Sequence, residues 1–306
     1  MDVNLNKMEN KINKNSLKIW SGRILNLVFG LCICIVIYVL AQLFFVTSFR
    51  IPSDSMEPSL LAGDYILVDK CSKGARFFDV LGALDKEDVK IHRMPGWRDF
   101  RRNDVLVFNF PYPGRWDSIV FDVMTYYVKR CIAVPGDTLE IRNSHFRIRG
   151  YDGKVGNVAA QDELQKLMES GEAETRGVVV RSYPNRDDVE WSIADFGPFY
   201  IPGKGDVMEM TPQNKLLYGN VIEWEQKRKL KLRGDTVWMG DSIISEYCFL
   251  ENYYFVSGDK MANSRDSRYW GLLPEPFIVG RAWRIWKSVD RGGDAVRWNR
   301  ILKKIE

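Results

Sequence analysis

The chain contains few of the residues that bind metals or build disulfide frameworks. Its 306 residues include five cysteines and two histidines, and no Cys-x-x-Cys pair occurs. Cys32 and Cys34 lie within a long apolar run, so at most one bridge can form among the other three: Cys71, Cys131 and Cys248. A disulfide-rich scaffold is therefore excluded, and we expect neither a metal site nor a cofactor.

Neither sign of charge is in large excess, and no low-complexity tract or internal repeat is visible. There are 44 basic and 40 acidic residues, which gives a net charge of +4, and part of this excess precedes the apolar run. Such a balance does not predict a nucleic-acid partner. Hydrophobic residues make up 45% of the chain, which is enough to build a globular core.

One apolar run, residues 27–46, contains no charged residue. As a helix rising about 1.5 Å per residue, it would span a hydrocarbon core of roughly 30 Å. A cleaved signal peptide would have an apolar core of roughly 7–15 residues followed by a small-x-small site. This run is longer and ends Phe44-Phe45-Val46-Thr47. We therefore expect a retained transmembrane anchor over residues 24–46.

Basic residues are concentrated before the anchor. Five of them precede it: Lys7, Lys11, Lys14, Lys18 and Arg23. Only Arg50 lies between the anchor and Asp54. Since cytoplasmic flanks carry the Lys/Arg excess, we expect residues 1–23 in the cytoplasm and residues 47–306 on the other side of the membrane.

After the anchor, short β-branched and aromatic runs alternate with Gly, Pro and Asp. The runs lie near residues 65–68, 105–110, 126–134, 138–142, 178–180, 221–224, 253–256 and 278–286. Turn signals such as Pro135-Gly136-Asp137 separate them. This pattern predicts antiparallel sheet with tight turns, and weaker helical patterns occur at residues 161–170 and 296–305.

The predicted C-terminal helix is amphipathic. Trp298, Ile301, Leu302 and Ile305 fall on one helical face, and basic residues flank this face. Such a helix would lie on an anionic membrane surface or pack on the protein's own core, and the sequence does not distinguish these two outcomes.

Ser55 lies nine positions beyond the apolar run, in a polar segment bounded by Pro52 and Pro58. A serine hydroxyl is a poor nucleophile unless a base accepts its proton. The two histidines are unfavourable candidates for that base, because His92 lies in a loop context and His145 beside a turn signal.

Lys129 is a second candidate for the base. In a strand, its face would carry Tyr127, Cys131 and Ala133, so the amine would be desolvated and its pKa lowered. Acting as a base near neutral pH requires a decrease of roughly 2–3 units from about 10.4. Periodicity alone favours a different interpretation, an edge-strand lysine that points into water.

Four segments together resemble the conserved boxes of type I signal peptidases, the membrane-bound Ser/Lys proteases of protein export. Residues 51–60, Ile-Pro-Ser-Asp-Ser-Met-Glu-Pro-Ser-Leu, resemble the nucleophile box, and residues 127–137, Tyr-Val-Lys-Arg-Cys-Ile-Ala-Val-Pro-Gly-Asp, resemble the lysine box. Residues 102–108 resemble the box between them. Residues 258–282 resemble the last box, with Asn-Ser-Arg-Asp-Ser-Arg at 263–268.

The resemblance assigns roles to single positions. It makes Ser55 the nucleophile, Lys129 the general base and Ser264 the hydroxyl that positions the lysine. It makes the Ser53 hydroxyl and the Ser55 N–H the oxyanion hole. Asp266 and Arg268 become a support pair, although a polar turn that caps its own backbone would explain the same residues.

The resemblance also implies how substrate binds, as an extended strand between residues 49–53 and 125–129. Bulky side chains would then restrict two pockets to small residues such as Ala. One pocket is expected from Met56, Leu60 and Tyr127, and the other from Phe49, Ile51 and Val128. Each of these residues could equally be part of the core.

Three positions depart from the family's pattern. Asn103 stands where Gly is usual, and Asn tolerates the left-handed conformation. Lys260 stands where Asn is usual; it could help to keep Lys129 neutral or could point away. Asp54, between Ser53 and Ser55, would oppose deprotonation of Lys129 if it pointed inward, and we expect it to point outward.

The predicted fold class is mainly β, with one N-terminal transmembrane helix. An antiparallel catalytic domain (residues 47–142 and 251–290) would carry an inserted β-rich subdomain (residues 143–250) and a basic amphipathic tail (residues 291–306). The expected protein is a monomeric serine endopeptidase of the bacterial inner membrane, with its catalytic domain on the periplasmic side. Its expected partners are the lipid bilayer and signal peptides, cleaved after Ala-x-Ala-like motifs.

Two other functions compete with this one. A soluble self-cleaving repressor shares Ser/Lys chemistry, but it would lack the anchor and would carry a DNA-binding domain. A membrane-tethered paralogue that binds signal peptides without cutting them would explain the Lys260 departure, but not the presence of both Ser55 and Lys129.

Overall fold

The computed structural model describes residues 2–186, 188–290, 292–293 and 295–305, and it divides into two units, Met1–Val46 and Thr47–Glu306. The first unit is one helix, α1 (Asp2–Phe44). Its segment Gly22–Phe44 has a mean hydropathy of 2.8 and is long and apolar enough to cross a membrane.

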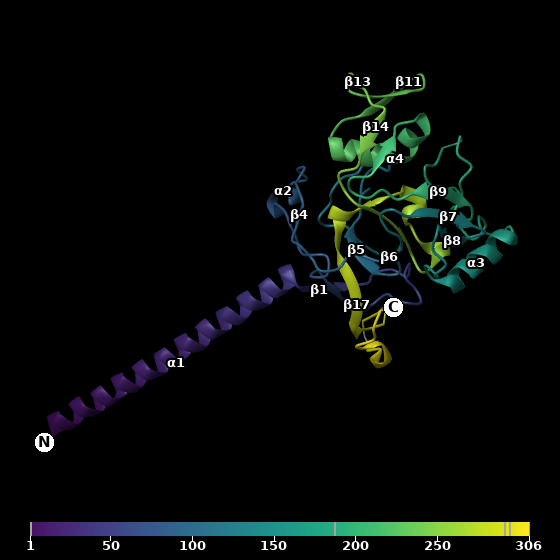
Figure 1. Cartoon of the computed structure of the whole chain (residues 1–306). Helices are drawn as coiled ribbons and strands as arrows, with labels where there is room; N and C mark the ends of the chain where they lie inside the picture. Colours follow the sequence, from purple (N-terminus) through teal and green to yellow (C-terminus); the bar gives the residue numbers. More distant parts are fainter. Residues whose placement is uncertain (1, 187, 291, 294, 306) are drawn as a thin grey trace. The chain divides into compact units, whose positions relative to one another are not determined.

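A seven-stranded sheet forms the centre of the second unit, and its strands β5, β6 and β17 are labelled in Figure 1. In spatial order its strands are β1 (Val46–Arg50), β2 (Asp64–Asp69), β17 (Ile278–Ser288), β5 (Val105–Asn109), β6 (Tyr126–Ala133), β15 (Tyr253–Ser257) and β16 (Leu273–Pro274). Every strand pair whose register is described is antiparallel. The expectation of a mainly β, antiparallel fold with one N-terminal apolar helix is confirmed.

Both faces of this sheet are buried. Every residue of β5 is buried, and its side chains alternate between two apolar clusters. Leu106 and Phe108 belong to the larger cluster, whereas Val105 and Val107 belong to the smaller one. Because successive strand side chains point to opposite faces, the two clusters cover the two sides of the sheet. The smaller cluster also contains residues of the segment that carries Ser55: Ile51, Met56 and Leu60.

The predicted insertion contains helices as well as strands. Its helices are α3 (Val158–Glu169) and α4 (Pro212–Gln226), and its strands are β8 (His145–Ile148), β9 (Phe196–Tyr200), β10 (Val207–Glu209), β11 (Leu230–Arg233), β12 (Thr236–Met239), β13 (Ser242–Ile243) and β14 (Glu246–Cys248). With β7 (Thr138–Arg142), they form the sheets β8-β7-β9, β11-β12-β13 and β10-β14.

Two strand predictions in this region are wrong. Residues 221–224 lie within α4, which begins at the N-cap Thr211 with Pro212 in its first turn. Three residues of this apolar face, Leu217, Val221 and Ile222, are buried at helical spacing, so helix periodicity prevails over the β-branched composition. Residues 178–180 form no strand; an isolated bridge, Arg181–Ser192, follows them. The helix predicted at 161–170 is confirmed as α3.

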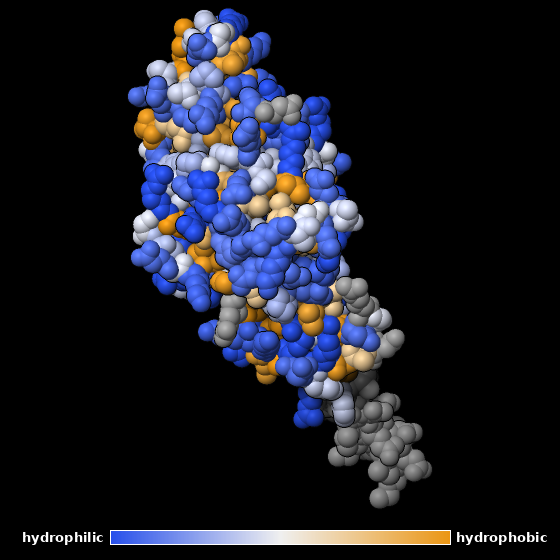
Figure 2. Space-filling model, turned by 90° about the vertical axis from the view of Figure 1, so that its right-hand side faces the viewer, coloured by the Kyte–Doolittle hydropathy of each residue, from blue (hydrophilic) through white to orange (hydrophobic). Residues whose placement is uncertain are grey.

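The insertion shares its core with the main sheet. Leu164, Phe199 and Val221 belong to the same apolar cluster as Leu106 of β5. Thr47–Glu306 accordingly forms one compact unit. The face shown in Figure 2 is mostly hydrophilic, with apolar residues in small separate patches.

The remaining elements are short. They are β3 (Arg76–Phe77), α2 (Val80–Leu84), β4 (His92–Arg93), α5 (Ser267–Trp270) and three 3₁₀ turns, η1 (Met261–Asn263), η2 (Glu275–Phe277) and η3 (Trp298–Arg300). β3 pairs with β4 as a separate hairpin.

The C-terminal segment is not the predicted amphipathic helix. Among the residues of this segment that the structure describes, only the turn η3 is helical, and Lys304 then bridges to Arg284 of β17. Arg300 is buried, with 8% of the residue exposed, and its side chain points into the protein toward Asp64. Ile305 packs against the smaller apolar cluster, whereas Trp298 stays 78% exposed. Inward salt bridges and strand-like pairing therefore prevail over the helical spacing of the apolar residues.

Candidate active site

Ser55 and Lys129 meet although they are far apart in the sequence. Ser55 lies in the turn-rich segment between β1 and β2, and Lys129 lies in β6. The Lys129 Nζ is 2.6 Å from the Ser55 Oγ and 3.2 Å from the Val128 carbonyl oxygen. A hydroxyl and an amine at hydrogen-bond distance can exchange a proton directly.

Lys129 is buried, with 4% of its surface exposed. Removal from water disfavours the ammonium form, and this desolvation lowers the pKa of Lys129 to about 8 even though nearby carboxylates oppose it. Its Nζ also lies 5.5 Å from the centre of the Tyr127 ring. The edge-strand interpretation, a lysine pointing into water, is therefore wrong.

Asp266 and Arg268 form a fully buried ion pair beside the lysine. Two nitrogens of the Arg268 guanidinium each lie 2.8 Å from a different Asp266 oxygen, and the Gly258 N–H donates to the same carboxylate at 2.9 Å. Burial alone would raise the pKa of Asp266, but the Arg268 guanidinium and the Gly258 N–H hold that pKa below its usual range. Asp266 also caps α5 by accepting from the Arg268 N–H, as the polar-turn interpretation expects, whereas the support role of the pair stays a prediction.

The Ser264 side chain lies beside Gly258, and no hydrogen bond joins its hydroxyl to the Lys129 amine among the described residues. Its hydroxyl is buried and makes no hydrogen bond of normal geometry within the part of the chain that the structure describes. A Cβ on Gly258 would lie 2.2 Å from the Ser264 Oγ and 2.5 Å from the Ser55 carbonyl oxygen. Only glycine fits between them, which gives Gly258 a role that motif reading did not assign.

Arg130, next to Lys129 in β6, forms hydrogen bonds to three other segments of the chain. Its guanidinium holds the Asp259 carboxylate at 2.7 and 2.6 Å, the Asn103 carbonyl at 2.9 Å and the Ser59 hydroxyl at 3.2 Å. Ser59 follows Ser55 in the same segment, and Asp259 directly precedes Lys260. Sequence reasoning gave these residues no role, because no local pattern shows that residues 130 and 259 meet.

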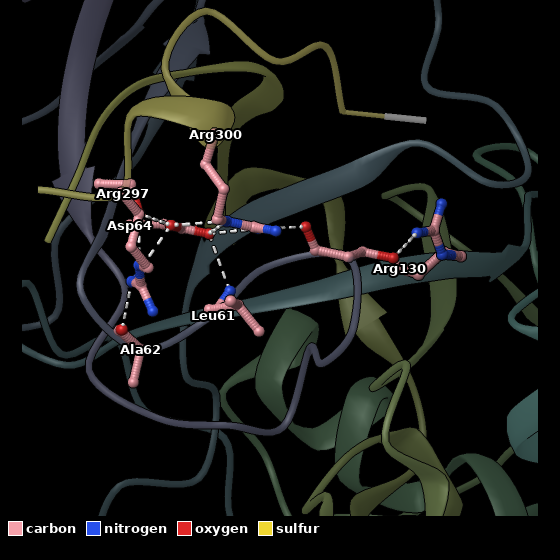
Figure 3. Close-up of polar contacts among 8 residues, drawn as sticks. Leu61, Ala62, Asp64, Arg130, Arg297 and Arg300 are labelled. Carbon is pink, nitrogen blue, oxygen red and sulfur yellow. Dashed lines mark hydrogen bonds and ion pairs between the residues drawn. The ribbon is translucent and has the colours of Figure 1, made fainter. Parts of the chain in front are cut away.

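A second buried cluster binds the C-terminal end of the segment that carries Ser55, residues 51–63 (Figure 3). Asp64 is fully buried, and Arg300 donates to it at 2.6 Å and to the Ser59 carbonyl at 2.9 Å. Asp64 also accepts from the Leu61 N–H at 2.8 Å. Burial would raise the pKa of Asp64, but the Arg300 guanidinium leads the hydrogen bonds that hold it below its usual range.

Arg297 completes this cluster from the same C-terminal segment. It donates to the Ala62 carbonyl at 2.7 Å and lies 3.4 Å from Asp64. The C-terminal segment thus binds residues 59–64 with two arginines. Sequence reasoning expected these arginines to flank the apolar face of a helix, on the membrane surface or on the protein's own core, and it did not predict this contact with Asp64.

Lys260 and Asp54 point toward each other. The Lys260 Nζ is 2.6 Å from an Asp54 oxygen and 3.2 Å from a Glu57 oxygen. Asn263 also donates to Asp54 at 3.1 Å. The Asp54 side chain is 23% exposed, so the expectation that it simply points outward is only partly correct.

Asn103 adopts the conformation expected for a residue that replaces glycine. Its φ is +70°, in the left-handed region. Its amide donates to the Lys154 carbonyl at 2.9 Å and accepts from the Gly156 N–H at 2.8 Å. The substitution therefore adds a link to the insertion and leaves the site intact.

Two strand edges beside Ser55 are open. β1 ends the sheet, and β15 pairs only with the second half of β6, at Arg130, Cys131 and Ala133. Tyr126 to Lys129 therefore pair with β5 alone. The Phe49 ring of β1 lies 5.0 Å from the Tyr126 ring of β6, so the two open edges approach each other here.

The residues expected to shape the substrate pockets divide between the two clusters. Ile51, Met56 and Leu60 are buried in the smaller cluster, and Phe49 and Val128 pack against it. Tyr127 stacks on Phe110 at 4.4 Å and packs on the larger cluster. Ser53 is exposed at the start of the nucleophile segment.

The contacts of the two histidines are with residues other than Ser55 and Lys129. His92 stacks on Phe77 at 5.4 Å, and the His145 ring contacts Asp162 at 2.9 Å. Among the described residues, no group of three or more His, Cys, Asp or Glu is arranged to hold a metal ion. The chemistry that the arrangement supports is attack by an activated serine on an acyl group held at an open strand edge.

Comparison with known proteins points to one family. Residues 24–286 match the family described as signal peptidase, peptidase S26. A signal peptidase I of Buchnera aphidicola from Acyrthosiphon pisum is 27% identical, over 97% of this chain and 86% of its own length. The Pseudomonas aeruginosa signal peptidase I is 26% identical, over 80% and 66%.

Among solved structures, a signal peptidase I from Enterococcus faecalis covers 60% of this chain and 97% of its own. It is 20% identical, with a TM-score of 0.27.

Proposed function

Because the chain belongs to the signal peptidase family, peptidase S26, we propose that it is a membrane-anchored serine endopeptidase using Ser55 and Lys129. Its substrates would be exported preproteins, from which it removes N-terminal signal peptides. The observation that carries the proposal is the 2.6 Å contact between the Ser55 hydroxyl and a buried amine whose pKa is lowered to about 8.

In the proposed reaction, neutral Lys129 accepts the Ser55 proton as the Ser55 Oγ attacks the scissile carbonyl carbon. The tetrahedral intermediate collapses to an ester on Ser55, and the lysine ammonium gives its proton to the departing amine. Lys129 then takes a proton from water, which hydrolyses the ester and frees the signal peptide. The lysine ammonium returns this second proton to the Ser55 Oγ as the ester C–O bond breaks, so the dyad ends in its starting state and no further group is required.

The negative oxygen of the intermediate needs donors placed in advance. We assign this role to the Ser55 N–H and the Ser53 hydroxyl. Asp266, Arg268 and Ser264 would act behind the dyad. The Asp266 carboxylate accepts from the Ser257 hydroxyl and the Gly258 N–H, which supports a role in holding residues 257–258 in place. Gly258 in turn packs closely against the Ser55 carbonyl.

Substrate would bind as an added strand between β1 and the open half of β6. Main-chain pairing there would give affinity, and side-chain pockets would give specificity. The bulky neighbours Phe49, Ile51, Met56, Leu60, Tyr127 and Val128 would leave room for small residues, which favours Ala-x-Ala-like sites. In this arrangement the scissile bond lies beside Lys129, the last residue of the open edge.

The anchor would place the catalytic unit at a membrane surface. We propose that α1 crosses the bacterial inner membrane with residues 1–23 inside, as its basic flank indicates. The catalytic unit would then lie on the periplasmic side, where preproteins emerge. The shared core supports treating residues 47–305 as one working unit, with residues 143–250 as an integrated insertion.

Cleavage of a preprotein tests this function directly. The full-length protein in detergent should cut a preprotein that carries an Ala-x-Ala site, and mass spectrometry should place the cut after the second Ala. Changing that Ala to a bulky residue should abolish cleavage. Binding of the signal peptide without cleavage would instead identify a non-catalytic paralogue.

A further inference from the structure

Lys260 is hydrogen-bonded, through both its main chain and its side chain, to residues 51–63, the segment that carries Ser55 and is called the nucleophile segment below. Its N–H donates to the Ser55 carbonyl at 3.0 Å. Its Nζ reaches the Asp54 and Glu57 carboxylates at 2.6 and 3.2 Å. The two acids lie one residue before and two residues after Ser55, so one ammonium bridges both sides of the nucleophile.

The trio contains two acidic side chains and one basic side chain. The hydrogen bond from Lys260 holds the pKa of Asp54 below its usual range, and the bond to Asp54 raises the pKa of Lys260. Two carboxylates and one ammonium carry a net charge of −1. Without Lys260 the same turn would carry −2 beside the proposed base.

This charge matters because a negative neighbour stabilises the protonated form of Lys129. Asp54 acts on the lysine amine in that direction. Desolvation of Lys129 acts in the opposite direction and produces the neutral amine that the reaction needs. Uncompensated charge at Asp54 and Glu57 would therefore work against the dyad.

We propose that Lys260 is a positioning residue that binds Asp54 and Glu57 and limits the negative charge acting on Lys129. The inference rests on the proposed function, because it assumes that neutral Lys129 is the base. It assigns a task to Lys260, whose ammonium never touches the Ser55 hydroxyl or the substrate carbonyl.

The other charges around Lys129 are already paired in the structure. Those facing it from other segments are Asp259, Asp266 and Arg268. Asp266 is bound by Arg268, and Asp259 by Arg130 of the same strand as Lys129. Asp54 is the charge near Lys129 whose compensation depends on Lys260.

The test is the pH profile of kcat/KM for a peptide substrate, measured on the full-length protein in detergent. Four proteins are compared: wild type, Lys260→Met, Lys260→Arg and the triple variant Asp54→Asn, Glu57→Gln, Lys260→Met. The Lys260 N–H remains in all of them, so the main-chain tether to Ser55 is kept. Thermal unfolding confirms that each variant is folded.

In Lys260→Met, the rising limb of the kcat/KM profile, where the rate increases with pH, should shift to higher pH by about 0.5 unit. This is the size expected for a partly screened charge. The rate should fall about threefold on the limb and stay within twofold on the plateau. Lys260→Arg should match the wild type, and the triple variant should return the limb to its original position. About 1 M salt should reduce the shift, because added ions screen the charges.

If kcat/KM of Lys260→Met rises over the same pH range as in the wild type, the inference is overturned, even if the plateau rate falls. A purely structural tether would lower the rate at every pH without moving the profile. Failure of the triple variant to restore the limb also overturns it. The proposed function is tested separately: retention of activity by Lys129→Ala refutes the dyad, whereas an unmoved limb refutes only the role of Lys260.

Discussion

Lys129 depends on its surroundings for the chemistry proposed here. An exposed lysine is protonated at neutral pH and cannot accept a proton, whereas this one is buried among aromatic and paired charged groups. The cost of burying an unpaired ammonium is what favours the neutral amine. The support pair Asp266–Arg268 neutralises itself, so it supplies rigidity with little net charge.

The first prediction at this scale concerns the dyad. Activity should rise with pH through a value near 8, because the amine must lose its proton to act as a base and its pKa is lowered to about 8. Lys129→Ala should reduce kcat nearly as far as Ser55→Ala, because the two groups act as a unit. Steady-state cleavage between pH 6 and 10 measures both effects.

Matched controls separate this mechanism from a histidine-dependent one. Lys129→His should not restore activity, because the shorter imidazole does not reach Ser55 from the same backbone position. The double variant His92→Ala, His145→Ala should cleave normally. Loss of activity in that variant while it remains folded would show that the base has been misassigned.

Gly258 provides the second residue-scale prediction. In Gly258→Ala the new Cβ would lie 2.5 Å from the Ser55 carbonyl and 2.2 Å from the Ser264 Oγ, so the nucleophile segment must move. We expect kcat to fall at least about 100-fold, since misplacement by about 1 Å can cost that much.

The matched control for Gly258→Ala is Gly219→Ala in α4, where the added Cβ would have no described atom within 4 Å apart from its chain neighbours and its own helix backbone. It should leave kcat unchanged and should keep or slightly raise stability, because Ala is the better helix former. Normal turnover by Gly258→Ala would show that the close packing there is not needed for catalysis.

The nucleophile segment is itself an element without regular structure, and it is held at both ends. The Ile51 N–H donates to the Asp64 carbonyl and the Gly63 N–H to the Ile51 carbonyl, each at 2.8 Å, which closes its base. Arg130 and Arg300 bind Ser59 from opposite directions, through its hydroxyl and its carbonyl. A segment with few regular hydrogen bonds is thereby fixed for catalysis by residues distant in sequence.

Arg300 gives the prediction that belongs to this element. Arg300→Met removes the main partner of a fully buried carboxylate, which should lower the free energy of unfolding by about 3 kcal/mol. The rate should also fall, because Ser59 loses its anchor. Chemical denaturation and peptide cleavage measure the two effects.

Lys303→Met is the control for Arg300→Met, because this neighbouring side chain is exposed. Its effect on stability should stay within about 0.5 kcal/mol. If the two variants had the same free energy of unfolding, the contact between Arg300 and Asp64 would not contribute to stability.

At the scale of the whole molecule, we expect anchoring and catalysis to belong to separate units. Thr47–Glu306 is a compact unit with two apolar clusters, whose described members all lie within it. Removal of residues 1–45 should therefore leave the thermal unfolding temperature within a few degrees of the full-length value. Cleavage of a short soluble peptide in detergent should persist, whereas processing of a preprotein in membranes should decline.

Failure of the shortened protein to fold would contradict this separation. Equal processing of membrane-inserted preprotein with and without α1 would show instead that the anchor is not needed to reach the substrate. Membrane flotation of both proteins provides the control, because only the one that carries residues 22–44 should float with lipid.

Local sequence determined the features that depend on neighbouring residues. The uncharged run predicted α1, and contiguous apolar residues predicted β5, β6, β15 and β17. The resemblance to signal peptidases identified the family, now confirmed by the match over residues 24–286. It also singled out Ser55 and Lys129, whose catalytic roles remain predictions although the structure brings them together.

Tertiary structure decided what depends on pairs distant in the chain. Arg300 and Asp64 are 236 positions apart, and Lys260 and Asp54 are 206 apart. Periodicity describes which face of an element a residue occupies, but not which partner a charge finds across the fold. The C-terminal segment therefore turned inward against the helical pattern of its apolar residues, because a buried carboxylate at Asp64 requires a cation from elsewhere in the chain.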